Sequence, residues 1–308
     1  MEKSLTSIMD MITPTKIIIT GFSGFVAHHL GMKLQEKGYF VVGVDKRPIP
    51  QGHSIPNEFI QTRVEDLGFR DLMGVKHIYH LAFITNIPNS VRHPIETTRD
   101  NIDMTIHLLQ YAKEASVEKV LFPSTASLYS NNPTPWKEDM PPMPIEPYSW
   151  QKLACEYACQ MYAKVYGLST IIVRLFQVFG ELQREDTALA MFIKAKREGK
   201  PIQLTETTAQ STFKSGQRDF IYAGDVAEAM IGLMESDKTG QGEIFNIGSG
   251  ELRTMEEIVN ALKAEVKWIP KRNYEVETHL ADISKIKNTI NWKPKVEVIK
   301  WLKSALIQ

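Results

Sequence analysis

Residues 16–27 read KIIITGFSGFVA, an apolar run that leads straight into a turn with two glycines. The β-branched beginning is typical of a buried parallel strand, and a helical pattern follows over residues 28–37. Between them stands Gly21-x-x-Gly24-x-x-Ala27, which in this context indicates a dinucleotide-binding turn. Gly21 permits a tight turn, Gly24 lets a pyrophosphate approach the backbone, and Ala27 keeps the helix close to the sheet. We therefore expect phosphates at the N-terminus of this helix.

The next predicted strand, residues 39–44, ends at Asp45, roughly 20 residues beyond the turn. A carboxylate there accepts hydrogen bonds from the adenosine ribose hydroxyls and repels a 2′-phosphate, so it favours NAD over NADP. Lys46 and Arg47 follow at once and weaken that preference. The alternative is a glycine-rich turn without a cofactor, and Asp45 argues against it. In this half of the chain we expect NAD to contact Gly21, Ser23, Gly24, Phe25, Val26, Asp45 and Lys46.

Strands and helices alternate along the rest of this half. Apolar runs predict strands at residues 77–81, 119–122 and 170–176, separated by helices at residues 95–115 and around Tyr148. Alternation at this spacing is typical of α/β proteins, so we expect a Rossmann-type, doubly wound parallel sheet.

The order loosens after residue 178. The patterns predict helices at 188–198, 225–236 and 254–266 and strands at 201–204 and 243–247, with Thr254 and Glu257 forming a capping box. The polar stretch 205–217 is predicted to be a mobile loop, a possible lid. These elements indicate a smaller, interleaved C-terminal α+β substrate-binding domain. The expected division is a flexible extension (1–15), an NAD-binding domain (16–178, with 214–236 returning to it) and a substrate-binding domain (179–213 and 237–308).

The composition excludes several functional classes. Of 308 residues, 43% are hydrophobic and 23% charged, and the zero net charge offers no electrostatic footprint for nucleic acid or an anionic membrane. No apolar run approaches the length of a membrane span, and residues 1–14 lack the apolar stretch of a secretory signal. Cys155 and Cys159 lie four apart on one predicted helix, so we expect two buried free thiols, no metal site, and a cytoplasmic protein.

Tyr148 and Lys152 are four residues apart, which places them one helical turn apart on the same face. A lysine ammonium close to a phenol favours the phenolate, so we expect Lys152 to lower the pKa of Tyr148 from about 10 toward the range of a general base. Such a tyrosine removes a proton from a substrate hydroxyl while a neighbouring cofactor takes the hydride. The spacing alone is common, and the alternative is an aromatic–lysine pair on a solvated face.

Together these motifs resemble the extended short-chain dehydrogenase/reductase family, in particular its nucleotide-sugar epimerase and dehydratase branch. The resemblance covers nearly the whole chain, from Lys16 to Leu306. Besides the glycine turn and the Tyr148/Lys152 pair, it rests on HLA (80–82), DNI (100–102), FPSTASLY (122–129), RLFQVFG (174–180), RDFIY (218–222) with DVA (225–227), FNIG (245–248) and ADISK (281–285).

The resemblance implies roles for the matching residues. Tyr148 would be the acid/base, Lys152 would hold the nicotinamide ribose, and Thr125 would hydrogen-bond the reacting sugar oxygen. Arg218 would clamp the substrate diphosphate, a role that suits a bidentate guanidinium, although a surface salt bridge is the alternative for it and for Arg272. The remaining cofactor contacts are expected at Val64, Leu81, Ala82, Phe83, Asn101 and Phe176, and the remaining substrate contacts at Thr85, Ser124, Gln177, Arg272 and Glu275.

The chain departs from the family pattern in three places. Gln177 stands where the family usually has Asn, and its extra methylene alters the expected substrate contact. Arg63-Val64 replace the usual Asp-hydrophobic pair beside the adenine, so Asp66 either takes over that contact or caps a helix. The stretch 205–217 is longer than its counterpart, which would reshape the sugar pocket.

The residues after Thr125 bear on the reaction. Dehydratases and decarboxylases of this branch usually carry an acid there, whereas this chain has Ala126-Ser127. The resemblance therefore favours 4-epimerisation of a nucleotide sugar, above all a UDP-hexose, with NAD regenerated in each cycle. The alternatives are a nucleotide-sugar dehydrogenase or 4-keto reductase and, from another class, a catalytically silent NAD-binding protein. The helices at 95–115 and 148–166 are apolar on more than one face, and such helices form a four-helix contact in this family, so we expect a homodimer.

Overall fold

A parallel sheet of seven strands forms the centre of the computed structural model, which describes residues 14–207, 211, 214–270 and 276–306. The strand order is β10-β6-β5-β4-β1-β2-β3, and every neighbouring pair is parallel. The order turns back at β1, as in doubly wound sheets. The strands are β1 (Lys16–Thr20), β2 (Phe40–Asp45), β3 (Glu58–Gln61), β4 (Val75–His80), β5 (Lys119–Thr125), β6 (Ser169–Leu175) and β10 (Gln241–Ile247).

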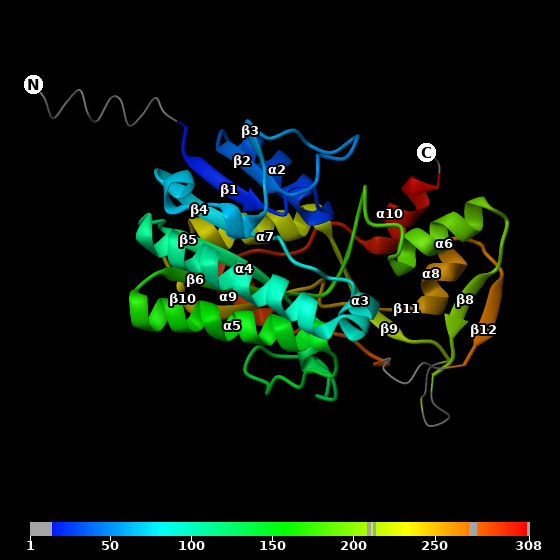
Figure 1. Ribbon diagram of the computed structural model, residues 1–308. Coiled ribbons are helices and arrows are strands. Elements are labelled where there is room, and N and C mark those ends of the chain that lie inside the picture. The colour runs from blue at the N-terminus through cyan, green and yellow to red at the C-terminus, as the bar shows by residue number, and fades with distance from the viewer. Residues whose placement is uncertain (1–13, 208–210, 212–213, 271–275, 307–308) are drawn as a thin grey trace, which may run out of the picture.

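Helices cover both faces of this sheet (Figure 1). On one face α2 (Phe25–Glu36) contacts α7 (Ala223–Glu235), and on the other α4 (Pro94–Glu114) lies beside α5 (Pro147–Tyr166). The isoleucines of β1 divide between the two hydrophobic cores, because alternate side chains of a strand point to opposite faces: Ile17 and Ile19 join the α2/α7 core, and Ile18 joins the α4/α5 core. The shorter helices of this part are η1 (Val64–Asp66), η2 (Phe69–Leu72), α3 (Ile87–Arg92), η3 (Ala126–Tyr129) and α9 (Ser284–Ile290).

A smaller part with its own core lies beyond the carboxyl edge of the sheet. It contains a three-stranded sheet, β11-β9-β7, and a two-stranded sheet, β12-β8. Its elements are β7 (Gln177–Phe179), α6 (Ala188–Arg197), β8 (Ile202–Thr205), β9 (Gln217–Tyr222), β11 (Leu252–Thr254), α8 (Met255–Ala261), β12 (Val266–Ile269) and α10 (Val298–Ala305). Figure 1 shows α6, α8, β8 and β12 clustered at one end of the molecule.

The predicted fold class is confirmed. The predicted and observed elements differ where a strand is short or forms by pairing with a distant segment. The capping box of Thr254 and Glu257 is present, but α8 ends at Ala261 and β12 follows, where one helix to residue 266 was expected. β10 pairs with β6 in the large sheet, although the expected boundary at residue 237 assigned it to the substrate-binding domain. The ends of the predicted loop 205–217 pair with each other, since Glu206 bridges Ser215.

The remaining expectations concern single features. Cys155 and Cys159 are buried free thiols, as expected. Among the described residues, no helix combines the length and the apolar character needed to span a bilayer. Most of the expected N-terminal extension lies outside the described residues.

Candidate active site

The glycine turn joins β1 to α2 at the carboxyl edge of the sheet. Gly21 has a φ of 69°, and a β-carbon on it would lie 2.6 Å from the backbone nitrogen of Ala82, so this approach requires glycine. The amide of Gly24 donates to the carbonyl of Gly21 over 2.9 Å, and α2 begins at Phe25, followed by Val26. The turn therefore presents a helix N-terminus at the edge where such sheets bind ligands.

Asp45 ends β2 beside this turn and is buried. Its Oδ2 accepts a hydrogen bond from the amide of Ser23 over 3.1 Å, and its Oδ1 accepts one from the amide of Arg47 over 2.9 Å. The Arg47 guanidinium lies 3.4 Å from the same carboxylate, while Lys46 is exposed. The carboxylate thus stands at the expected place, and Arg47 is the cation against it.

The residues expected beside the adenine lie in and around η1. Val64 begins this turn and is buried in the α4/α5 core. Arg63 pairs with Glu65, and Asp66 is exposed at the end of the turn. The amide of Asp66 donates to the Arg63 carbonyl over 3.2 Å, which closes the turn.

The end of β4 is fastened to the glycine turn by side chains. Thr20 Oγ1 lies 2.8 Å from His80 Nδ1 and accepts a hydrogen bond from the Ala82 amide over 3.2 Å. From α4, the Asn101 amide oxygen accepts a hydrogen bond from the Ile84 backbone over 2.7 Å. Asn101 is fully buried and supports this segment, and its direct contact with the cofactor stays a prediction.

Thr125 and Tyr148 come from neighbouring elements. Thr125 ends β5, and its hydroxyl donates to Ser127 Oγ over 3.1 Å. Tyr148 stands in the first turn of α5, whose N-cap is Glu146. Burial raises the pKa of Tyr148 to about 12, although hydrogen bonding from Thr125 opposes the rise.

Lys152 follows one turn later, and its ammonium donates to the Pro123 carbonyl over 2.6 Å. The prediction that Lys152 lowers the pKa of Tyr148 is wrong in direction, because loss of hydration outweighs the favourable interactions of the phenolate. Burial also lowers the pKa of Lys152 itself, to about 7.

Ser124, Phe176 and Gln177 lie on adjacent strand ends. Ser124 is 4% exposed, and its hydroxyl is one of the buried side-chain groups that have no hydrogen-bond partner among the described residues. The Phe176 ring lies 6.0 Å from that of Trp136, and Gln177 begins β7 opposite Phe220. These positions bring the expected nicotinamide and sugar contacts together.

Arg218 lies on β9 in the smaller part. Its Nη1 donates to the carbonyls of Gln217, over 2.9 Å, and Glu277, over 3.0 Å. His279 stacks against Trp136 with ring centres 5.0 Å apart, and burial lowers its pKa to about 3, with a further contribution from Arg218. The two other expected contacts of this part, Arg272 and Glu275, lie outside the described residues.

Comparison with known proteins gives consistent matches over nearly the whole chain. The sequence model of the NAD-dependent epimerase/dehydratase family matches residues 17–248. The chain belongs to this family.

Two curated relatives illustrate the likeness. The chain is 29% identical to a UDP-glucuronate 4-epimerase of Thermodesulfobacterium geofontis, with 94% of each chain covered. It is 28% identical to a UDP-glucose 4-epimerase of Corynebacterium glutamicum, with 91% of each covered.

Two solved structures are similar throughout. The UDP-glucose 4-epimerase of Thermotoga maritima with UDP-glucose has a TM-score of 0.85 and 28% identity, covering 95% of this chain and 98% of its own. The UDP-glucuronic acid 4-epimerase of Bacillus cereus, in complex with UDP-glucuronic acid and NAD, has a TM-score of 0.85, 27% identity and the same coverages. The expected family, fold and epimerase-type enzyme are therefore confirmed at the level of the family.

NAD is the cofactor of the NAD-dependent epimerase/dehydratase family, and the residues present fit it. The turn at Gly21 and Gly24 leaves backbone and a helix N-terminus where a pyrophosphate is bound in such folds. Asp45 places a carboxylate at the end of β2, where the adenosine ribose is bound in such folds. At the other end of the edge, the unpartnered Ser124 hydroxyl and the Lys152 ammonium supply polar groups for the nicotinamide half.

One residue near the candidate active site, Arg184, was not predicted from the sequence. Arg184, between β7 and α6, donates a hydrogen bond of 2.5 Å to Thr85 Oγ1, between β4 and α3. Its positive charge also favours the Tyr148 phenolate. The available signal was the charged cluster Arg184-Glu185-Asp186, three residues after the RLFQVFG motif.

Proposed function

We propose that this protein interconverts a UDP-hexose and its 4-epimer through a transient 4-keto sugar. The observation that carries the proposal is the meeting of Thr125 and Tyr148 at the carboxyl edge of the sheet, with Ala126 and Ser127 where an eliminating enzyme would need an acid. Bound NAD supplies the acceptor, and then the donor, of the C4 hydride. The relatives named as 4-epimerases of UDP-sugars support the same assignment.

The proposed roles of the residues follow from this geometry. Tyr148 takes the proton of the C4 hydroxyl, and Thr125 holds the same oxygen by a hydrogen bond. Lys152 holds the nicotinamide ribose, and the hydrogen bond from Thr125 together with the charge of Arg184 opposes the high pKa that burial sets for Tyr148. After the keto sugar turns, the hydride returns to the opposite face of C4 and Tyr148 returns the proton.

The two parts of the chain would divide the binding. Residues 16–178 with α7 and β10 would hold NAD, and residues 179–213 with β9 and the elements after β10 would hold the nucleotide sugar. In the second part Arg218, Arg272 and Glu275 are proposed to contact the diphosphate and the nucleotide ribose, with Thr85, Ser124 and Gln177 near the sugar.

A UDP-hexuronate is a second candidate substrate. Arg184, which pairs with Asp186, places a guanidinium near enough to Tyr148 for its charge to act on the phenol, and a sugar carboxylate would be a second partner for that cation. The similar proteins include UDP-glucuronate 4-epimerases.

The deciding experiment denatures the purified protein, identifies any released dinucleotide, and incubates fresh enzyme with UDP-, GDP- and dTDP-sugars without added cofactor. Conversion to the 4-epimer with NAD retained is the expected result, and the sugar panel identifies the substrate. If turnover requires added NAD or NADH, with absorbance changing in step, the protein is instead a nucleotide-sugar dehydrogenase or 4-keto reductase.

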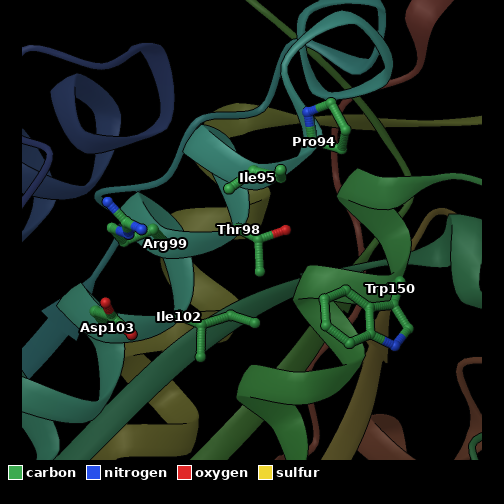
Figure 2. Close-up of a pocket in the computed structure, with 7 residues that line it drawn as sticks. All are labelled: Pro94, Ile95, Thr98, Arg99, Ile102, Asp103 and Trp150. Carbon is green, nitrogen blue, oxygen red and sulfur yellow. The ribbon is translucent and has the colours of Figure 1, made fainter.

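The proposed enzyme is a homodimer joined through α4 and α5. Figure 2 shows Trp150 of α5 beside Ile95 and Ile102 of α4, together with Pro94, Thr98, Arg99 and Asp103, around one shallow surface pocket. Ile95 is 78% exposed and Trp150 49%, and Tyr157 and Met161 extend the apolar face along α5. An apolar face of this extent on two adjacent helices is typical of a protein interface. A monomeric mass by light scattering at micromolar concentration would contradict this assignment.

The proposed location is the cytoplasm. Cys155 and Cys159 are both buried free thiols, which suits a reducing compartment. Carbohydrate biosynthesis would be the corresponding physiological role.

A further inference from the structure

The ammonium of Lys152 is enclosed by two aromatic rings and one carbonyl oxygen. Its Nζ lies 3.5 Å from the centre of the Phe83 ring and 4.5 Å from the centre of the Phe122 ring. The Pro123 carbonyl accepts its hydrogen bond over 2.6 Å, and the residue is 4% exposed. The face of an aromatic ring is negative, so both rings stabilise the charged form of the lysine.

Phe83 also contacts the other catalytic candidate. Its ring packs edge-on against Tyr148, with centres 6.0 Å apart and planes at 78°. The same ring lies 6.0 Å from Phe122, at 60°. Phe83 therefore touches both the lysine and the tyrosine, and it is the closer of the two rings to the ammonium.

We propose that Phe83 is a positioning residue that keeps Lys152 charged and directed toward the end of β5, where the nicotinamide ribose is expected. The inference rests on the proposed function for the task of Lys152, and it adds a task for Phe83 beyond lining the cofactor. A buried ammonium loses its hydration, and a ring face at 3.5 Å replaces part of it.

The charge state of Lys152 is finely balanced near neutral pH. Burial lowers its pKa to about 7, so a modest change in its surroundings decides whether the ammonium or the amine is present. The other titratable groups that act on it are Cys155, Glu156 and Cys159 of α5 and His80 of β4. Glu156 is paired with Arg174, and its charge still raises the pKa of Lys152.

The test replaces Phe83 with Leu, which keeps an apolar side chain but removes the ring face. Loss of a cation–π contact should lower the pKa of Lys152 further, so less of the lysine is charged at alkaline pH. Calorimetric titration of dinucleotide-depleted enzyme with NAD should show F83L within about twofold of wild type at pH 6 and about three- to tenfold weaker at pH 8. F83Y, which restores the ring, should follow wild type at both pH values.

The controls separate positioning from packing. Phe59→Leu removes a phenylalanine from β3, outside the site, and should show no pH-dependent change in NAD affinity. Phe83→Met provides a second ringless variant if F83L folds poorly. The proposal would be overturned if F83L lost the same NAD affinity at pH 6 and pH 8. It would also be overturned if the NAD affinity of F83Y depended on pH as strongly as that of F83L. Because NAD binding needs no sugar, a failed epimerase assay would reject the proposed function and leave this result standing.

Discussion

Arg184 donates a 2.5 Å hydrogen bond to Thr85, although 99 residues separate them along the chain. The same guanidinium contacts both carboxylate oxygens of Asp186, over 2.8 and 3.1 Å. The contact joins the segment after β7 to the segment after β4, and the charge of Arg184 acts on Tyr148. Arg184 is therefore tied to both parts of the molecule at the candidate active site.

Replacing Arg184 with Ala should reveal whether it binds an anionic sugar. If it does, kcat/KM for UDP-glucuronate should fall about ten- to a hundredfold more than that for UDP-glucose, because a charge-assisted hydrogen bond is lost only with the uronate. The measurement is the ratio of the two specificities in each variant. Arg92→Ala, on the exposed side of α3, is the control. Equal losses for both sugars would remove the uronate assignment.

Replacing Tyr148 with Phe should lower turnover about a hundredfold or more, since general acid–base catalysis is lost while the ring remains. The conversion of substrate to epimer gives the rate. Tyr166→Phe, at the other end of α5 and 48% exposed, should retain wild-type turnover. Turnover of the Tyr148 variant within tenfold of wild type would show that the general-base assignment is wrong.

Replacing Glu156 with Gln should cost about 3–5 kcal/mol of the free energy of unfolding. Glu156 and Arg174 are 1% and 2% exposed and form two hydrogen bonds, of 2.9 and 2.7 Å, so the variant leaves a guanidinium buried without its counter-ion. Urea denaturation measures the loss. Glu118→Gln, which removes an exposed partner of Lys76, should cost less than about 1 kcal/mol. Similar losses in the two variants would contradict the buried-pair argument.

Replacing His28 with Asn should make stability less sensitive to acid. Burial lowers the pKa of His28 to about 4, and the nearby His29 and His53 contribute. The folded state therefore binds fewer protons than the unfolded state, so stability is complete above pH 6.5 and declines as pH falls toward 4. The asparagine oxygen can still accept the hydrogen bond that Ser54 donates to His28, over 2.7 Å.

Thermal unfolding across this pH range gives the readout for His28. The unfolding midpoint of the wild type minus that of the variant should decrease by a few degrees between pH 7 and pH 4. A constant difference across the range would show that His28 does not titrate with unfolding.

Local patterns in the sequence predicted the central elements well. The strand–turn–helix at residues 16–37 and the helix that carries Tyr148 and Lys152 appear within a few residues of their expected limits. Strands β3, β7 and β11 were missed, because three or four residues carry too weak a periodic signal to stand alone. The six-residue β9 was missed as well, and it pairs with β7 and β11, which are distant in the sequence. The helix predicted to residue 266 failed in a similar way, since β12 exists through its pairing with β8.

The sequence by itself determined the family, the doubly wound sheet and the residues available for NAD and for acid–base chemistry, because these depend on residue type, spacing and short-range periodicity. Tertiary structure alone decided the electrostatic state of the site. Burial reverses the expected shift of Tyr148, and the rings of Phe83 and Phe122 surround the ammonium of Lys152. The tertiary structure also brings Arg184 into contact with Thr85. Hydration and long-range contacts depend on which distant segments meet, and residue spacing does not encode that directly.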